Sequence, residues 1–305
     1  IMVAATHTHA GPDGIFKEPI FVSISTSNEN LISDIKIKIK QSILSAMEKK
    51  KVTEIRAGKT TVKGASANRR VKNGPVDKQL ITIRFDDNTG KMISAIINFA
   101  CHPTVLDASN LLLSADYPGY VMSFIEKIKN DSIPLFLNGA AGDVSTRYVR
   151  RESSFREVER IGNIVGSYAL ISLETSNKIN INKVKMDRKY VDVRVRRFPL
   201  DEEINQMISR AEAMYNALIK SKVSTEDLRR AAVVYETLKN IKKYIDRLRP
   251  LEGKTIKIEV QVLAFGDKVA IVDILGEMFT EIGMKIKENT PQLAKNLIHH
   301  LTCQI

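Results

Sequence analysis

The chain of 305 residues has no tryptophan, only two cysteines and only five histidines. Cys101 and Cys303 lack the close spacing of a cysteine metal motif, and two thiols are too few for a disulfide scaffold. No run of about 18 apolar residues occurs, so we expect no transmembrane helix. No signal peptide begins the chain, which leaves a cytoplasmic location as the default expectation.

Acidic residues are outnumbered, with 35 Asp and Glu against 47 Lys and Arg, for a net charge of +12. The basic excess is spread over both halves of the chain rather than concentrated in one arm or helix, and no RNA- or DNA-binding motif occurs. We therefore expect no nucleic-acid partner. A weak peripheral contact with anionic membrane surfaces stays open, and the oligomeric state is not determined by the sequence.

The segment Thr6-His7-Thr8-His9 is the most informative in the chain. It follows the apolar run 1–5, which predicts a buried strand over 1–9, and Gly11-Pro12 stops that strand. Side chains two positions apart share one face of a strand, so the rings of His7 and His9 should project together. Two adjacent imidazoles suit a zinc ion. The alternative is a histidine pair that hydrogen-bonds to nearby backbone.

In three further segments, an apolar run that predicts a strand is also followed by polar residues that could form a site. His102 ends the apolar run 92–101, and a strand from Ile133 leads into a small-residue loop that carries Asp143 and Ser145. The strand 269–275 delivers Glu277 to the start of a helix over 279–288. Taken singly, Asp143 is a turn former and Glu277 a favourable charge near a helix N-terminus. Taken together, the four strand ends supply the imidazoles, carboxylate and hydroxyl of a zinc hydrolase.

Periodicity elsewhere predicts alternating strands and helices, and hence a mixed α/β fold. A helical hairpin over about 201–249 is expected to be inserted into it, and Ser224 with Asp227 resembles a capping box at the second helix. We expect one domain over 1–305 with the site at strand ends. The further strands are expected near 52–58, 80–85, 92–101, 133–137, 190–196 (half-exposed), 255–265 and 269–275, and the further helices near 28–50, 119–130 and 155–175.

Five ordered segments carry a resemblance to a known family. They are Ala5–Gly14, Asn98–Thr104, Ser114–Gly119, Asn138–Ser145 and Gly276-Glu277. With them the chain resembles the catalytic domain of the neutral/alkaline (non-lysosomal) ceramidase family across residues 1 to about 285. The tail from about 290 to 305 is unmatched, and both ends look shortened.

The resemblance implies one zinc ion bound by His7, His102 and Glu277. It also implies a catalytic trio of Ser145, His9 and Arg69, with Arg70 as an alternative register for the arginine. Ser145 would act as nucleophile or as hydroxyl donor to the oxyanion. The implied reaction is hydrolysis of an N-acyl amide bond, converting ceramide to a sphingoid base and a fatty acid.

The chain departs from the family pattern at two positions within the site. The family uses a tyrosine downstream of the ligand glutamate, whereas this chain has no tyrosine after Tyr244. The serine motif usually continues with Pro-Asn, whereas here it continues with Thr146-Arg147. Two alternatives therefore stay open: a zinc amidase or esterase acting on a smaller, non-sphingoid substrate, and a metal-binding relative without turnover.

Overall fold

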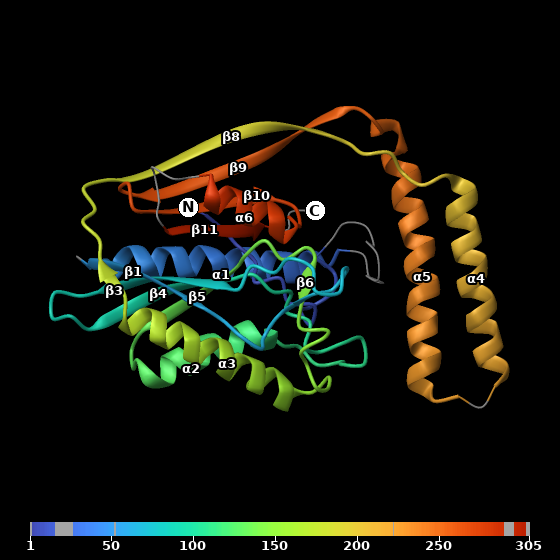
Figure 1. Cartoon of the computed structure of the whole chain (residues 1–305), viewed down its shortest axis with the longest axis horizontal. Coiled ribbons are helices and arrows are strands. Elements are labelled where there is room, and N and C mark those ends of the chain that lie inside the picture. The colour runs from blue at the N-terminus through green and yellow to red at the C-terminus, as the bar shows by residue number, and fades with distance from the viewer. Residues whose placement is uncertain (1, 16–26, 52, 222, 290–295, 303–305) are drawn as a thin grey trace. The chain divides into compact units, whose positions relative to one another are not determined.

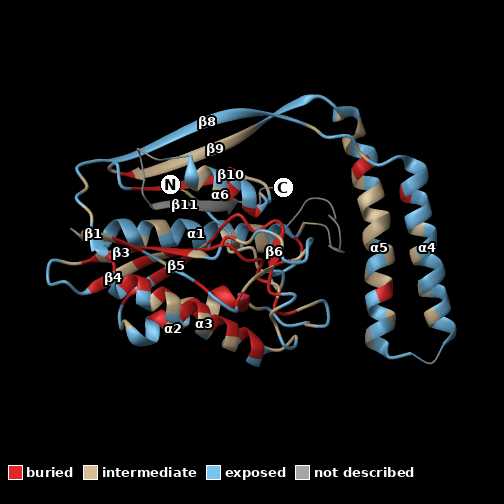
Figure 2. Ribbon diagram, viewed as in Figure 1, coloured by how far each residue is buried: buried red, intermediate tan, exposed pale blue. Residues whose placement is uncertain are grey.

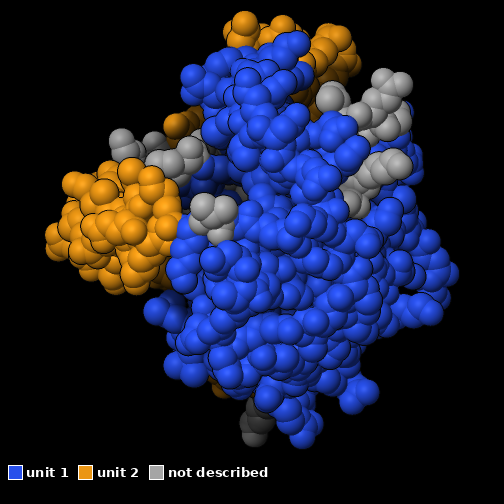
Figure 3. Space-filling view, turned by 90° about the vertical axis from the view of Figure 1, so that its left-hand side faces the viewer, with its two compact units in different colours: residues 1–11, 51–191, 258–305 blue, residues 12–50, 192–257 orange. Residues whose placement is uncertain are grey.

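The computed structural model describes residues 2–15, 27–51, 53–221, 223–289 and 296–302. The chain groups into two compact units, which are coloured separately in Figure 3. The first comprises residues 1–11, 51–191 and 258–305, and the second comprises residues 12–50 and 192–257. The expected single domain stays a prediction.

A five-stranded mixed sheet forms the centre of the first unit (Figure 1). Its strand order is β5-β4-β3-β1-β7, and β4 and β5 are parallel whereas the other neighbours are antiparallel. The strands span β1 (Glu54–Thr61), β3 (Gln79–Asp86), β4 (Met92–Phe99), β5 (Ile133–Asn138) and β7 (Asn177–Lys178). These positions confirm the predicted strands at 52–58, 80–85, 92–101 and 133–137 to within a few residues.

Alternating side chains of β3 serve two different cores. Leu80 faces a core shared with helices α2 (Asp116–Ile128) and α3 (Phe155–Glu174), whereas Ile81 and Ile83 face the opposite side. One core lies on each side of the sheet, and the residues of both cores are buried (Figure 2). Because successive strand side chains point to opposite faces, a continuous apolar run here indicates a sheet covered on both sides.

A second sheet, of order β11-β10-β9-β8, covers the opposite face. Val269 and Ile271 of β10 (Val269–Leu275) pack against β1 and β3, and the alternate residues of β10 pack towards α6 (Thr280–Glu288). The hairpin between β9 (Thr255–Phe265) and β10 turns at Gly266, whose φ is 61°, as its sequence predicts. β11 (Asn296–Thr302) pairs with β10 in parallel.

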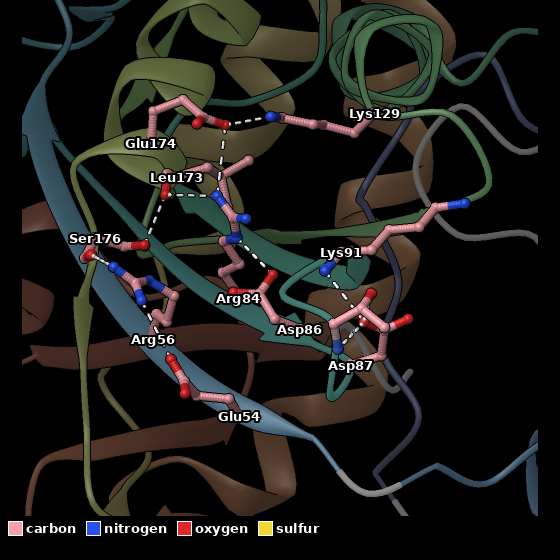
Figure 4. Close-up of polar contacts among 11 residues, drawn as sticks. Glu54, Arg56, Arg84, Asp86, Asp87, Lys91, Lys129, Leu173, Glu174 and Ser176 are labelled. Atoms are coloured by element: carbon pink, nitrogen blue, oxygen red, sulfur yellow. Dashed lines mark hydrogen bonds and ion pairs between the residues drawn. The ribbon is translucent and has the colours of Figure 1, made fainter.

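Ion pairs connect the C-terminal ends of α2 and α3 to the five-stranded sheet (Figure 4). Arg84 lies 2.7 Å from Asp86 and 3.5 Å from Glu174, which in turn lies 2.6 Å from Lys129. Arg84 and Asp86 stand at the end of β3, Lys129 follows α2 and Glu174 ends α3. This network therefore lies at the end of the sheet where β3 ends and β4 begins.

The second unit is helical. It contains α1 (Glu29–Glu48), α4 (Asp201–Lys220), α5 (Thr225–Leu248) and the short 3-10 helix Arg249–Leu251. Stacked rings of Tyr215 and Tyr235 join α4 to α5, which confirms the predicted helical hairpin. The backbone N–H of Asp227 donates to the Ser224 hydroxyl, so the predicted cap at α5 is also confirmed. Among the described helices, none is long and apolar enough to cross a membrane.

Two predictions of local structure are wrong. Residues 2–9 do not form a strand, since His7 adopts a positive φ of 68° that extended backbone does not permit. The strand expected at 190–196 is β8 (Val184–Arg194), and it is exposed along its whole length rather than half-exposed. Residues 290–295 and 303–305 of the unmatched tail lie outside the described residues, as does Ile1 of the first predicted strand.

Candidate metal centre

The parallel pair β4 and β5 sets the position of the candidate site. Their carboxyl ends, Phe99 and Asn138, are register partners, so the two loops that follow start side by side. His102 lies in the first loop, and its backbone forms a bridge with Ser145 at the end of the second. Loops beyond the carboxyl ends of neighbouring parallel strands are where sites in α/β sheets collect.

Three imidazoles meet beyond these strand ends. One ring nitrogen from each of His7, His9 and His102 lies within 4.8 Å of the corresponding nitrogens of the other two rings. The Nε2 atoms of His7 and His102 are 2.9 Å apart, and the His9 ring centroid lies 5.2 Å from that of His7 and 5.5 Å from that of His102. The expected convergence of His7 and His9 is therefore present, although the segment is not a strand and His7 has a left-handed backbone.

Glu277 lies beside the three histidines. One carboxylate oxygen lies 3.4 Å from His7 Nε2 and the other lies 3.5 Å from His102 Nε2. Two ligand atoms bound about 2.0–2.1 Å from a tetrahedral ion lie about 3.3 Å apart. The distances among the three donors, 2.9 Å between the imidazoles and 3.4 and 3.5 Å to the carboxylate, bracket that value. The nitrogen and oxygen donors are also those that zinc accepts. The residues present therefore fit a zinc ion.

The tautomer of His102 supports this use of its ring. Its Nδ1 lies 2.6 Å from the carbonyl oxygen of Ala141, which can only accept, so Nδ1 carries the proton. In the neutral ring, Nε2 then presents its lone pair towards His7 and Glu277. A backbone carbonyl that orients the second nitrogen is the usual support of a metal-binding histidine. The backbone contact expected for a merely structural pair is not found for the rings of His7 or His9 among the described residues.

Close backbone contact places Glu277 against the serine loop. The N–H of Gly142 donates to the carbonyl of Met278 at 2.9 Å, and a Cβ atom at Gly142 would lie 2.6 Å from the carbonyl oxygen of Glu277. Gly276 has a φ of 113°, a conformation that strongly favours glycine. The two glycines therefore allow the carboxylate to reach the histidines.

Of the two candidate arginines, Arg69 lies against the imidazoles. Its Nη2 atom lies 3.3 Å from His102 Nε2 and 3.9 Å from a Glu277 oxygen, and it donates to the Gly142 carbonyl at 2.7 Å. Arg70 instead lies over the ring of Phe279, at 5.3 Å from its centroid. Of the two registers that the sequence left open, the geometry therefore favours Arg69.

Ser145 is joined to the site by its backbone. Its side chain is buried, and its Oγ accepts the N–H of Arg147 at 3.2 Å. No hydrogen bond joins this hydroxyl to an imidazole or a carboxylate among the described residues. The structure thus brings His7, His9, His102, Glu277 and Arg69 into one cluster, with Ser145 beside it.

Electrostatics keep the donor groups in the forms that bind a metal. Burial lowers the pKa of His7 from 6.5 to about 4, helped by His102 and opposed by Glu277. Partial burial of the His9 ring also lowers its pKa to about 4, and the neighbouring His7 and His102 act in the same direction. The contact with His102 lowers the pKa of Glu277 to about 2, helped by His7 and Arg69 and against the effect of burial. Both imidazoles are therefore neutral, and the carboxylate ionised, near pH 7.

Burial lowers the pKa of the Arg69 guanidinium, and the charges of Arg147 and Arg70 act in the same direction, while Glu277 opposes them. The positive side chains of Arg70 and Arg147 therefore lie close enough to Arg69 to act on it.

Two carboxylates support the loops of the site, a role that the sequence did not assign to either of them. Asp116, with a φ of 52°, accepts the N–H groups of Leu106, Val105 and Tyr117 and so fixes the loop that follows His102. Asp143 accepts from the N–H of Thr280, at the start of α6. Asp116 belongs to the segment Ser114–Gly119, and the match of that segment to the family pattern was the feature of the sequence that pointed to Asp116.

Asn68 links this support to Arg69. Its Nδ2 donates to Asp143 at 3.0 Å, and its Oδ1 accepts the N–H groups of Arg70 and Val71. The N–H of Arg69 donates to the carbonyl of Asp143. In the pair Asn68-Arg69, the first residue therefore holds the loop and the second lies in the cluster.

The fold and this cluster define a mixed α/β protein with three imidazoles that could hold a metal ion beyond its strand ends. Residues 1–152 match the model of the family described as neutral/alkaline non-lysosomal ceramidase, N-terminal. The chain belongs to this family, through the family's N-terminal region.

Curated relatives agree with this assignment. The neutral ceramidase of Pseudomonas aeruginosa is 28% identical over 160 residues, which is 48% of this chain and 24% of the relative. Neutral ceramidase 2 of Arabidopsis thaliana is 26% identical over 188 residues, which is 55% of this chain and 24% of the relative. The matched region thus spans about a quarter of the length of these relatives.

Solved structures show the same fold. The crystal structure of neutral ceramidase from Pseudomonas aeruginosa superposes with a TM-score of 0.69 at 18% identity, covering 98% of this chain and 53% of that one. A structure described as ceramidase complexed with C2 gives a TM-score of 0.70 at 16% identity, covering 98% and 54%. This chain therefore spans about half the length of the matched structures.

Proposed function

We propose that the chain is a zinc-dependent hydrolase that cleaves an N-acyl amide bond, with ceramide as the substrate that the family suggests. The observation that carries the proposal is the convergence of His7, His102 and Glu277, whose donor atoms lie 2.9–3.5 Å apart. One zinc ion held by these three residues would polarise the amide carbonyl and lower the pKa of a bound water to about 7.

The residues around the three ligands have distinct tasks. Arg69 lies against both His102 and Glu277 and keeps the carboxylate aimed at the imidazoles. The Ser145 Oγ accepts one backbone N–H and so has its own proton left to donate to a developing oxyanion. The low pKa of His9 makes its ring neutral at the start of the reaction, so it first accepts a proton and then delivers it to the leaving amine.

The reaction class is tested by fatty-acid release. The chain would be incubated with ceramide, a short N-acyl amide and a short ester, each with and without a chelator. Chelator-sensitive release from ceramide supports the proposal. Release from the small compounds alone identifies an amidase or esterase of narrower substrate, and zinc binding without any release identifies a metal-binding relative.

Zinc stoichiometry of variants tests the ligand set. His7→Ala and His102→Ala are expected to lose stoichiometric zinc, whereas His9→Ala keeps zinc and loses turnover. The variant Glu277→Gln distinguishes a ligand set of two imidazoles and the carboxylate from a set of three imidazoles. If Glu277→Gln keeps zinc and His9→Ala loses it, the three imidazoles bind the ion without the carboxylate. Zinc retained by both His7→Ala and His102→Ala would contradict the proposed centre.

A further inference from the structure

A pocket of about 800 Å³ lies in the first unit beside the strand pair that carries Ser145. This volume is in the range of small-molecule sites, about 300–1,000 Å³. The polar residues that line it include Ser66, Asn68, Arg70, Lys72, Lys78 and Tyr148.

The charges of this pocket are of one sign. Arg70, Lys72 and Lys78 line it, no acidic residue does, and none of the three has an ion-pair partner among the described residues. A larger cleft of about 1280 Å³ near the start of β1 differs in this respect. There Arg56 and Arg84 lie within 3.2 Å and 2.7 Å of acidic side chains (Figure 4). The smaller pocket thus keeps positive charge available for a ligand.

The loop that presents these cations is held in place. Asn68 accepts the N–H groups of Arg70 and Val71, and donates to the carbonyl of Pro75 at the other side of the loop. A Cβ atom at Gly74 would lie 2.9 Å from the Asn68 side chain, so the loop closes on that amide. A fixed loop spares the entropic cost of ordering it on binding.

The pocket adjoins the candidate active site. Ala67, which lines it, is the register partner of Ser145, whose other backbone neighbour is His102. Adjacent strands lie about 4.8 Å apart, so the pocket wall is about 10 Å from the backbone of His102. Arg70 also lies over Phe279, two residues after Glu277.

We infer that this pocket binds an anionic group of the substrate, a carboxylate or a phosphate, which makes the preferred substrate an anionic N-acyl amide. The inference rests on the proposed amide hydrolysis at the adjacent centre. Arg70 supplies a planar guanidinium for the two oxygens of such a group, and the two lysines add charge. A linker that spans about 10 Å would join that group to the scissile amide.

Matched substrates test the inference with the full chain. N-lauroyl-6-aminohexanoate carries a carboxylate at a suitable distance, N-lauroyl-6-aminohexanol is its neutral counterpart, and the phosphate ester of that alcohol replaces the carboxylate by phosphate. We expect the anionic compounds to have KM values lower by on the order of 10-fold, an effect weakened by salt. Whichever anion gains more identifies the group that the pocket prefers.

A triple variant, Arg70→Gln with Lys72→Gln and Lys78→Gln, should remove the difference in KM and leave kcat on the neutral compound unchanged. The matched control removes three exposed positive charges elsewhere, through substitution to Gln of Lys59, Lys127 and Lys189. The control should keep the preference for the anion. A preference that survives in the triple variant, or that disappears equally in the control, would overturn the inference.

Equilibrium binding in the presence of a chelator separates this inference from the proposed reaction, because hydrolysis is then stopped. Tighter binding of the anionic compounds by the wild type than by the triple variant supports the pocket even if no amide is ever cleaved. Equal binding of the anionic and neutral compounds by the wild type overturns the pocket even if both are hydrolysed.

Discussion

The Nε2 atoms of His7 and His102 lie 2.9 Å apart, although the two residues are 95 positions apart in the chain. Two neutral imidazoles at this distance can share a proton or share a cation. His102 already has the proton on Nδ1, where Ala141 accepts it. A shared cation would use both Nε2 lone pairs, and the Glu277 carboxylate lies beside them.

Zinc is expected to stabilise the chain by mass action. With free zinc at 100 times its dissociation constant, the added stability is about 2.7 kcal/mol, because the ion binds the folded state. Thermal unfolding with zinc and with chelator measures the difference. His7→Ala should abolish it, and Lys127→Gln should not. An equal shift in His7→Ala would place the bound zinc elsewhere.

Acid should weaken the metal-free chain in two steps. The folded-state pKa of His7, about 4, is below its ordinary value of 6.5. The unfolded chain therefore binds more protons between these values, and stability falls as pH decreases from 6.5 to 4. Glu277, whose folded-state pKa is about 2, adds a second loss as pH falls from its ordinary value of 4.5 towards 2.

Urea unfolding in chelator at a series of pH values measures this profile. The variant His7→Gln with His9→Gln should flatten the step between pH 6.5 and 4 and leave the lower step in place. A midpoint that is constant through the upper window, or a double variant with an unchanged slope, would contradict the assigned pKa values.

Asp116→Ala should destabilise the fold strongly. The carboxylate is buried and accepts three backbone N–H groups, from Val105, Leu106 and Tyr117. Each donor left unsatisfied costs about 1–3 kcal/mol, so a loss of at least about 3 kcal/mol is expected. Asp116→Asn keeps one carbonyl acceptor and tolerates a positive φ, and should cost less. Denaturant unfolding of both variants measures the order, and equal stability of Asp116→Ala and the wild type would exclude this role.

Gly142→Ala should displace Glu277. The new Cβ atom would lie 2.6 Å from the Glu277 carbonyl oxygen, where backbone rather than a flexible side chain has to move. We expect a stability loss of about 1–3 kcal/mol and weaker zinc binding. Gly11→Ala is the control, because its nearest contact would be an ordinary 3.7 Å. Zinc titration of the two variants measures the effect, and unchanged zinc affinity in Gly142→Ala would separate this contact from the site.

Ser145→Ala should lower hydrolysis by about 100-fold or more, the loss expected for an oxyanion donor or a nucleophile. The two roles differ in what accumulates. A nucleophile leaves an acyl group on the wild-type chain that hydroxylamine releases, whereas a donor leaves none. Rapid quench with mass spectrometry distinguishes them, and an unchanged rate in the variant would remove the serine from the reaction.

Most elements of the first unit could be predicted from the sequence, because alternating or continuous apolar runs specify strands that are buried on one or both faces. The first segment was the exception. Its apolar residues 1–5 predicted a strand, but His7 takes a left-handed conformation, and local propensity does not reveal which contacts compensate that cost. The rings of His7 and His9 converge nevertheless, since neighbouring residues in a bent segment can also face one centre.

The sequence by itself determined the donor types and their positions at chain breaks, because Gly and Pro stop strands by local sterics wherever they occur. The tertiary structure alone decided how they combine. It placed Arg69 rather than Arg70 against His102, made the Ala141 carbonyl the partner of the His102 ring and set Asp116 against the loop that follows His102. These outcomes depend on which loops the parallel pairing of β4 and β5 brings together. Such pairings join residues far apart in the chain, and no local pattern encodes their final distances.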